Sequence, residues 1–134
     1  MSRQYCEVIK EINNKDWGKF CEKLNTLRHD SLLTIEAVRP DGRKEELARD
    51  VPLQNVRFEK TEGCSDMIFV EVGSGAGKER PMQHVITEPI HIRVKTTDQP
   101  GAYNPLMIEA ESGVTMITFH PALRQDLFED VQLA

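Results

Sequence analysis

The chain has 134 residues, of which 39% are hydrophobic and 29% charged, and its formal net charge is −5. This length suits one hydrophobic core, so we expect a single domain over residues 1–134. The composition excludes intrinsic disorder, and the acidic balance argues against nonspecific binding to nucleic acid, which needs a basic surface.

Residues 1–13 carry a mixed pattern. The apolar side chains of Tyr5, Val8, Ile9 and Ile12 follow helical spacing, but the segment also alternates in part. We expect a packed lead-in that forms either a short strand or a turn of helix.

A helix is predicted over residues 15–28. Asn14 precedes it as a capping residue, since its side chain can accept a hydrogen bond from a free backbone N–H. Apolar side chains then recur at steps of three and four, which places one stripe along the helix: Trp17, Phe20, Leu24 and Leu27.

From residue 31 the hydrophobic period changes to two, which is typical of strands. A Pro-Asp-Gly turn follows the first strand at Pro40, and Pro52 is expected to interrupt the chain between the second and third strands because proline donates no backbone hydrogen bond. The predicted strands are residues 31–39, 43–50, 54–60, 66–72, 82–87, 90–97, 106–111 and 114–120. The connections at Glu88-Pro89 and Ser112-Gly113 are read as hairpin turns, and residues 73–81 and 98–105 as loops.

Strands joined by tight turns pair antiparallel, because parallel neighbours need long crossovers. The expected fold class is therefore α+β: a mostly antiparallel sheet of about seven or eight strands, sandwich-like or an open barrel, with an N-terminal amphipathic helix and a short C-terminal helix. Residues 14–120 would form the core of the domain. Residues 121–134 would form a tail with a short helix, which is indicated by the spacing of its apolar side chains Leu123, Leu127, Phe128 and Val131.

A glycine-rich stretch at residues 73–78 is superficially like a phosphate-binding loop. That loop needs glycine where Val72 stands and a hydroxyl where Glu79 stands, and it opens a helix. Pro81 and a strand follow instead. A hairpin loop is the better interpretation, and no nucleotide or other cofactor is expected.

Two histidines are the main candidates for chemistry. If Glu88-Pro89 is a two-residue loop, His84 pairs with Arg93, and His84 and His91 share one face of the sheet. Such a pair can contribute metal ligands or an acid and a base. No third ligand is evident, so we prefer partly buried histidines and expect neither a metal site nor catalytic residues.

The same register predicts a basic strip of His91, Arg93 and Lys95, which would meet an acidic partner or pair with Glu109 and Glu111 across the sheet. We favour the pairing. Trp17, the only tryptophan, either anchors the core or lines a ligand pocket, and the core is favoured. The weak candidates for ligand binding are thus Trp17, His84, His91 and Arg93.

The order of these features resembles a bacterial family of small domains of unknown function, over roughly residues 14–120. A Trp-x-x-Phe helix, a Pro-Leu pair, an apolar strand, a His-x-Ile-x-x-Pro segment and a final hairpin ending in Phe carry the resemblance. Here they are Trp17 and Phe20, Pro52-Leu53, the strand through Ile68 and Val70, His84 to Pro89, Leu106, Ile108 and Glu109, then Gly113 and Phe119. Glu109 directly follows Ile108, which departs from the family pattern. The resemblance implies no activity, cofactor or catalytic residue.

These observations favour a non-enzymatic binding or protein-interaction module whose exposed strand edges recruit a protein partner or a second copy. One alternative is a small-ligand carrier or sensor with a pocket between helix and sheet. Another is an enzyme that uses His84 and His91. Residues 1–15 lack the apolar core of a signal peptide and the three cysteines suggest no disulfide framework, so we expect a cytoplasmic protein that does not enter a membrane.

Overall fold

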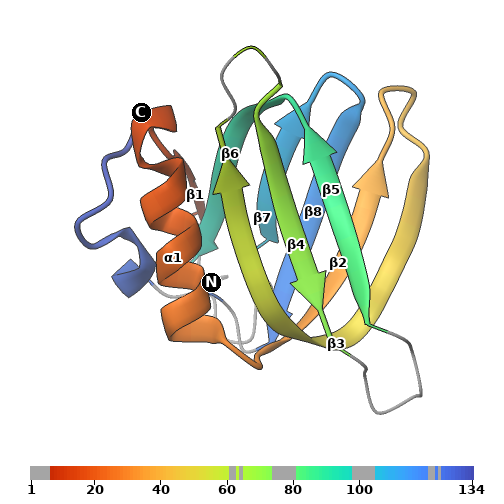
Figure 1. Cartoon of the computed structure of the whole chain (residues 1–134), viewed down its shortest axis with the longest axis horizontal. Helices are drawn as coiled ribbons and strands as arrows, with labels where there is room; N and C mark the ends of the chain where they lie inside the picture. The colour runs from red at the N-terminus through yellow and green to blue at the C-terminus, as the bar shows by residue number, and fades with distance from the viewer. Residues whose placement is uncertain are drawn as a thin grey trace, which may run out of the picture.

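The computed structural model describes residues 7–60, 63, 65–73, 81–97, 105–120, 123 and 125–134. Eight strands, one α-helix and two short 3-10 helices lie within these ranges (Figure 1). In chain order they are β1 (Glu7–Glu11), η1 (Asn14–Asp16), α1 (Trp17–Arg28), β2 (Leu32–Val38), β3 (Lys44–Glu59), β4 (Met67–Val72), β5 (Met82–Thr87), β6 (Pro89–Thr97), β7 (Pro105–Ala110), β8 (Gly113–His120) and η2 (Gln125–Phe128). None of the helices in these ranges is long and apolar enough to cross a membrane.

The strands form one open antiparallel sheet with the order β1-β6-β7-β8-β2-β3-β4-β5. This confirms the predicted α+β class with an antiparallel sheet. The sheet bends sharply along β3, whose first half pairs with β2 and whose second half pairs with β4. As a result the second half of β3 forms a front layer with β4 and β5, and the first half of β3 belongs to a back layer with the other strands (Figure 1).

The long strand β3 corrects the prediction of two strands separated at residues 51–53. The chain stays extended through Pro52, which lies opposite Leu32 of β2. The bend is produced by register shifts in the pairing with β2 and by Asp50, whose φ is 50°. A bulge of this kind turns a strand without ending it.

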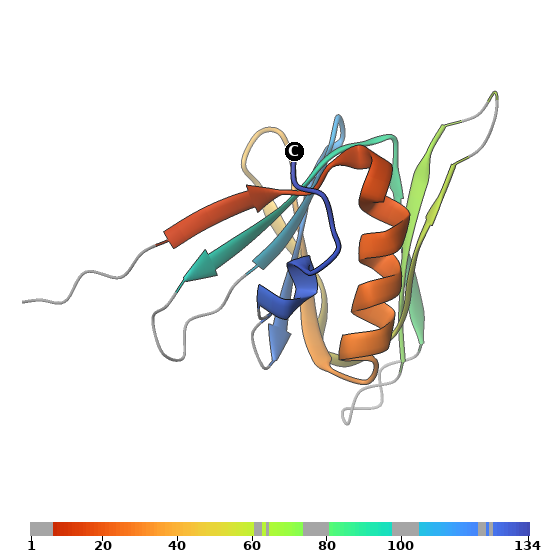
Figure 2. The ribbon, with the colours of Figure 1, turned by 90° about the vertical axis from the view of Figure 1, so that its left-hand side faces the viewer.

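Helix α1 lies along one open side between the two layers (Figure 2). Four of its side chains belong to the core: Trp17, Phe20, Cys21 and Leu24. Leu27 does not continue the stripe as predicted, since 46% of it is exposed. The predicted cap is wrong: Asn13, not Asn14, accepts a hydrogen bond from the backbone N–H of Lys15, at 3.0 Å, and it caps the 3-10 turn η1. Helix α1 follows this turn, and its own N-cap residue, Asp16, makes no side-chain capping bond.

The C-terminal tail lies against the end of β1 and the two residues that follow it. The lead-in forms a strand, and the tail forms a 3-10 turn with Leu123, Leu127 and Val131 buried. The backbone N–H of Asn13 donates to Gln132 O at 2.8 Å, and that of Ala134 donates to Glu11 O at 2.9 Å. The tail therefore covers part of the outer edge of β1.

Two connections differ from their predictions. β5 and β6 are not a hairpin, because β5 pairs with β4 while β6 pairs with β1 and β7. Glu88, with a φ of 52°, instead carries the chain from one layer to the other. The β7–β8 turn consists of Glu111 and Ser112, one residue earlier than predicted, and Gly113 already pairs with Ala110. Loops were predicted at residues 73–81 and 98–105, and their parts at 74–80 and 98–104 lie outside the described residues, as do the cysteines at positions 6 and 64.

Candidate functional site

The two histidines singled out from the sequence lie apart, on opposite faces. His84 shares the inner face of β5 with the buried Ile86, and its Nε2 lies 3.0 Å from Thr115 Oγ1 of β8. His91 neighbours the buried Ile92 on β6 and so lies on the outer face. The predicted pair is therefore wrong, because it depended on a β5–β6 hairpin. Burial lowers the pKa of His84, which favours its neutral form beside the Thr115 hydroxyl.

The predicted basic strip is part of a charge cluster on the outer face of the back layer. The Arg93 guanidinium donates to Glu11 Oε1 at 3.1 Å and to Glu109 Oε2, so it joins β1, β6 and β7. His91 Nδ1 lies 3.1 Å from Glu11 Oε2, without the alignment of a hydrogen bond. His91 and Arg93 lower the pKa of the Glu11 carboxyl. The predicted pairing of Arg93 with Glu109 is confirmed. The contact between Arg93 and Glu11 in addition ties the edge strand β1 to β6.

Trp17 lies in the core, with 5% of its surface exposed. Its indole N–H donates to Ile12 O at 3.2 Å, and its ring packs edge-on against Phe58 with centroids 5.5 Å apart. Both the indole N–H and the ring of Trp17 thus contact other parts of the fold. The geometry favours the anchoring role over the pocket role.

The described residues offer little for catalysis or metal binding. No group of three or more His, Cys, Asp or Glu side chains among them is arranged to hold a metal ion. Burial raises the pKa of the Cys21 thiol to about 12, so this cysteine is an inert core residue at neutral pH.

The edges of the sheet provide the more informative feature. An unpaired strand edge tends to recruit another strand, and proteins protect such edges by cover, charge or proline. The tail covers β1. The first half of β3 is rich in charge, and α1 covers the second half through Asn25, whose side chain bonds both backbone groups of Val56.

Among the described residues, β5 is the edge strand that shows none of these protections. Its sequence, MQHVIT, contains no Lys, Arg, Asp, Glu or Pro, and β4 is the one described strand that pairs with it. The backbone N–H of Glu88 donates to Asp66 O at 2.8 Å, in register with the β4–β5 ladder. Because bonded residues alternate along an antiparallel strand, His84 and Ile86 bond to β4 while Gln83, Val85 and Thr87 direct their N–H and C=O groups to the free side.

A small recess lies beside this free edge. It has a volume of about 100 Å³ and lies between residues 84–86 of β5, the end of β2 and the β7–β8 turn. Its walls include several small residues, which is why the space is open: Ala37, Ala110, Ser112 and Gly113. His84, Val85 and Ile86 line it from β5, so the recess and the free backbone groups form one continuous surface, here called the β5 edge site.

The comparisons with known proteins concern the whole fold. The sequence model of a family of unknown function, DUF5335, matches residues 8–126. The chain belongs to this family. No curated protein and no solved structure matched the chain. The predicted resemblance to a family of small domains of unknown function is confirmed.

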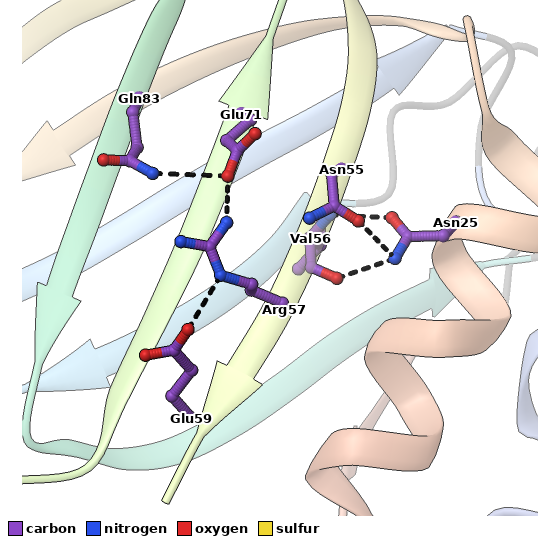
Figure 3. Close-up of polar contacts among 7 residues, drawn as sticks. All are labelled: Asn25, Asn55, Val56, Arg57, Glu59, Glu71 and Gln83. Carbon is purple, nitrogen blue, oxygen red and sulfur yellow. Dashed lines mark hydrogen bonds and ion pairs between the residues drawn. The ribbon is translucent and has the colours of Figure 1, made fainter. Parts of the chain in front are cut away.

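In this DUF5335 chain the outer face next to β5 is held in order by a polar network (Figure 3). Arg57 of β3 donates to Glu59 Oε1 at 3.0 Å and also to Glu71 of β4, while Gln83 Nε2 donates to Glu71 Oε1 at 3.2 Å. The Arg57 guanidinium also lies 4.2 Å from the Phe69 ring centre. These contacts join the three strands of the front layer, so side-chain contacts as well as backbone pairing hold β5 against β4.

Of the four predicted ligand-binding residues, only His84 lies at the β5 edge site. Val85, which carries the central free N–H, was missed, as were Ala37 and the β7–β8 turn. The absence of charge in residues 82–87 is visible in the sequence. What the sequence does not reveal is that β5 is the last strand, because that follows from the crossover at Glu88.

Proposed function

We propose that this chain is a non-enzymatic protein-interaction module that binds an extended segment of another polypeptide along β5. The partner segment would add a strand to the front layer, with its backbone bonded to Gln83, Val85 and Thr87. The observation that carries the proposal is the free edge of β5. The backbone N–H and C=O groups of Gln83, Val85 and Thr87 point away from β4, and the strand contains no charged residue and no proline. A cytoplasmic location, expected from the sequence, would suit such a role.

The arrangement of the layers supports a single strand as the occupant. The β2–β3 hairpin lies in the back layer and projects past the free edge of β5 (Figure 1). A strand added to β5 would lie over the inner side of this hairpin and cover the partly buried Leu47 and Ala37. A second copy paired β5 to β5 would bring its own hairpin into the same space, which disfavours self-association.

A proline substitution tests the proposal without disturbing the existing ladder. Val85 directs its N–H away from β4, so Val85→Pro removes a donor from the free side alone. Val85→Thr is the matched control, since it keeps the N–H and suits a strand. Peptides would first be selected from a random display library on the unmodified chain, and their affinities for all three proteins would then be measured.

Strand addition at β5 would weaken binding to Val85→Pro by about tenfold or more, since one backbone hydrogen bond is lost and a ring blocks the edge. Val85→Thr would bind within about twofold of the unmodified chain. Selected peptides that bind Val85→Pro as tightly would contradict the proposal. So would a selection that yields no binding peptide.

A further inference from the structure

The β5 edge site also restricts the side chains that a docked strand can carry, and this inference rests on the proposed function. In a strand bonded to Val85, the residue opposite Val85 places its side chain on the outer face. Its two neighbours, opposite His84 and Ile86, place theirs on the inner face. The inner face at this point is the recess.

Most of the lining of the recess is apolar or already paired. Ala37, Ile86 and Ala110 contribute apolar side chains, and His84 and Thr115 are within hydrogen-bond distance of each other. Arg39 also lines the recess and is paired with Glu45 at 3.7 Å, and Ser112 is exposed. A polar or charged side chain entering between these groups would lose more hydrogen bonds to water than it could replace. The recess therefore favours an apolar side chain.

The volume of the recess also limits the size of the side chain that can enter it. A space of about 100 Å³ holds roughly three water molecules at liquid density. The walls are formed by backbone and small residues on the side of β2 and the β7–β8 turn, and by His84 and Ile86 on the side of β5. Gly113 shows how closely they pack, because a Cβ added to it would lie 2.3 Å from Val38 O. Such walls do not widen readily to admit an aromatic ring.

The outer face of β5 does not restrict the side chains of a docked strand in this way. Gln83, Val85 and Thr87 are exposed there, and Val85 lies opposite Phe69 of β4. Side chains of a docked strand on this face would remain in contact with water. Selectivity would then come from the inner positions.

We propose that the β5 edge site selects extended segments with a branched aliphatic residue, valine or isoleucine, at the inner position that enters the recess. Alanine would leave the recess unfilled, and phenylalanine would exceed it.

Three synthetic probes test this inference. The first is a short acetylated and amidated peptide of alternating threonine and isoleucine with a lysine at each end. The second and third replace every isoleucine with alanine or phenylalanine. Each is titrated into the isotope-labelled chain, and its dissociation constant is read from the shift of the Val85 backbone amide signal.

Two variants test whether the preference for isoleucine comes from the recess. Ala37→Leu fills the recess from the chain's own side, and Glu36→Leu, on the outer face of the same strand, is its control. The isoleucine peptide is expected to bind about tenfold or more tightly than either other peptide. Ala37→Leu should remove that advantage, and Glu36→Leu should keep it.

The outcomes separate the two proposals. Equal affinity of the isoleucine and alanine peptides, tighter binding of the phenylalanine peptide, or an advantage that survives Ala37→Leu would overturn the side-chain inference. Strand addition would still be supported in these cases by the shift of the Val85 amide. Failure of all three peptides to shift that amide would contradict the proposed function as well.

Discussion

The side-chain amide of Asn25 pairs with the backbone of Val56 as a neighbouring strand would. The Val56 N–H donates to Asn25 Oδ1 at 2.7 Å, and Asn25 Nδ2 donates to Val56 O at 2.8 Å (Figure 3). One helix residue thus satisfies both backbone groups that Val56 directs away from β4. The contrast with β5, whose groups at Val85 have no such cover among the described residues, is the basis of the proposed function.

Asn25→Ala should lower the free energy of unfolding by about 1–3 kcal/mol, because two partly buried backbone groups of Val56 lose their partners. Denaturant titration measures this change. Thr26→Ala is the control on the exposed side of α1, and it should change stability by no more than about 0.5 kcal/mol. Equal effects of the two substitutions would mean that Asn25 does not cap β3.

Gly113→Ala should destabilise the fold by more than about 2 kcal/mol. Gly113 has a φ of 138°, and an added Cβ would lie 2.3 Å from Val38 O, so the substitution combines backbone strain with a clash against β2. Gly18→Ala is the matched substitution within α1, where an added Cβ meets nothing within 4 Å. It should stabilise the chain by about 0.5–1 kcal/mol. Thermal or denaturant unfolding of both variants checks the opposite signs.

His84 should make stability depend on pH below its ordinary pKa of 6.5. Burial lowers its pKa in the folded state, so below pH 6.5 the unfolded chain takes up a proton that the folded chain refuses. The free energy of unfolding should therefore fall as pH decreases through this window, by at most about 1.4 kcal/mol per pH unit. His84→Gln should remove that slope.

His29→Gln is the control for this measurement, since His29 is exposed at the end of α1. Its curve of stability against pH should keep the slope of the unmodified chain. A slope that persists in His84→Gln would show that the protonation of another group is responsible.

Glu11 should contribute to stability in a lower pH window. His91 and Arg93 lower its pKa from 4.5, so its stabilising effect is present above that value and is lost as pH falls through the lower folded pKa. Glu11→Gln should lower stability at neutral pH by at most about 1 kcal/mol, because the carboxylate is 31% exposed and screened by water. The loss should vanish in strong acid. Glu45→Gln, in an exposed pair with Arg39, should have little effect at any pH.

The strands could be predicted from the sequence because their signals are local. Alternation of apolar and polar residues located β2 and the strands from β4 to β8 to within a few residues, whereas β1 was left open between strand and helix and β3 was divided in two. Trp17, Phe20 and Leu24 correctly marked the buried side of α1. The resemblance to a family of small domains rested on the order of such local features. These parts of the fold need no knowledge of which strands are neighbours.

The site could not be predicted because it depends on long-range pairing. Glu88-Pro89 has the composition of a hairpin turn, yet the better partners of β5 and β6 are β4 and β7, so the chain crosses between layers there. His84 and His91 were brought together by the wrong pairing. Pro52 was expected to end a strand, but it lies in the bend of β3, where a single strand serves both layers.

Hydrogen exchange of individual backbone amides along β5, followed by NMR, tests the central claim most directly. In the free chain the amides of Gln83 and Val85 should exchange within about tenfold of the rate in an unstructured peptide. Those of His84 and Ile86, which bond to β4, should be protected by about a hundredfold or more. An amide of Val85 as slow as that of His84 would contradict the claim that β5 has a free edge.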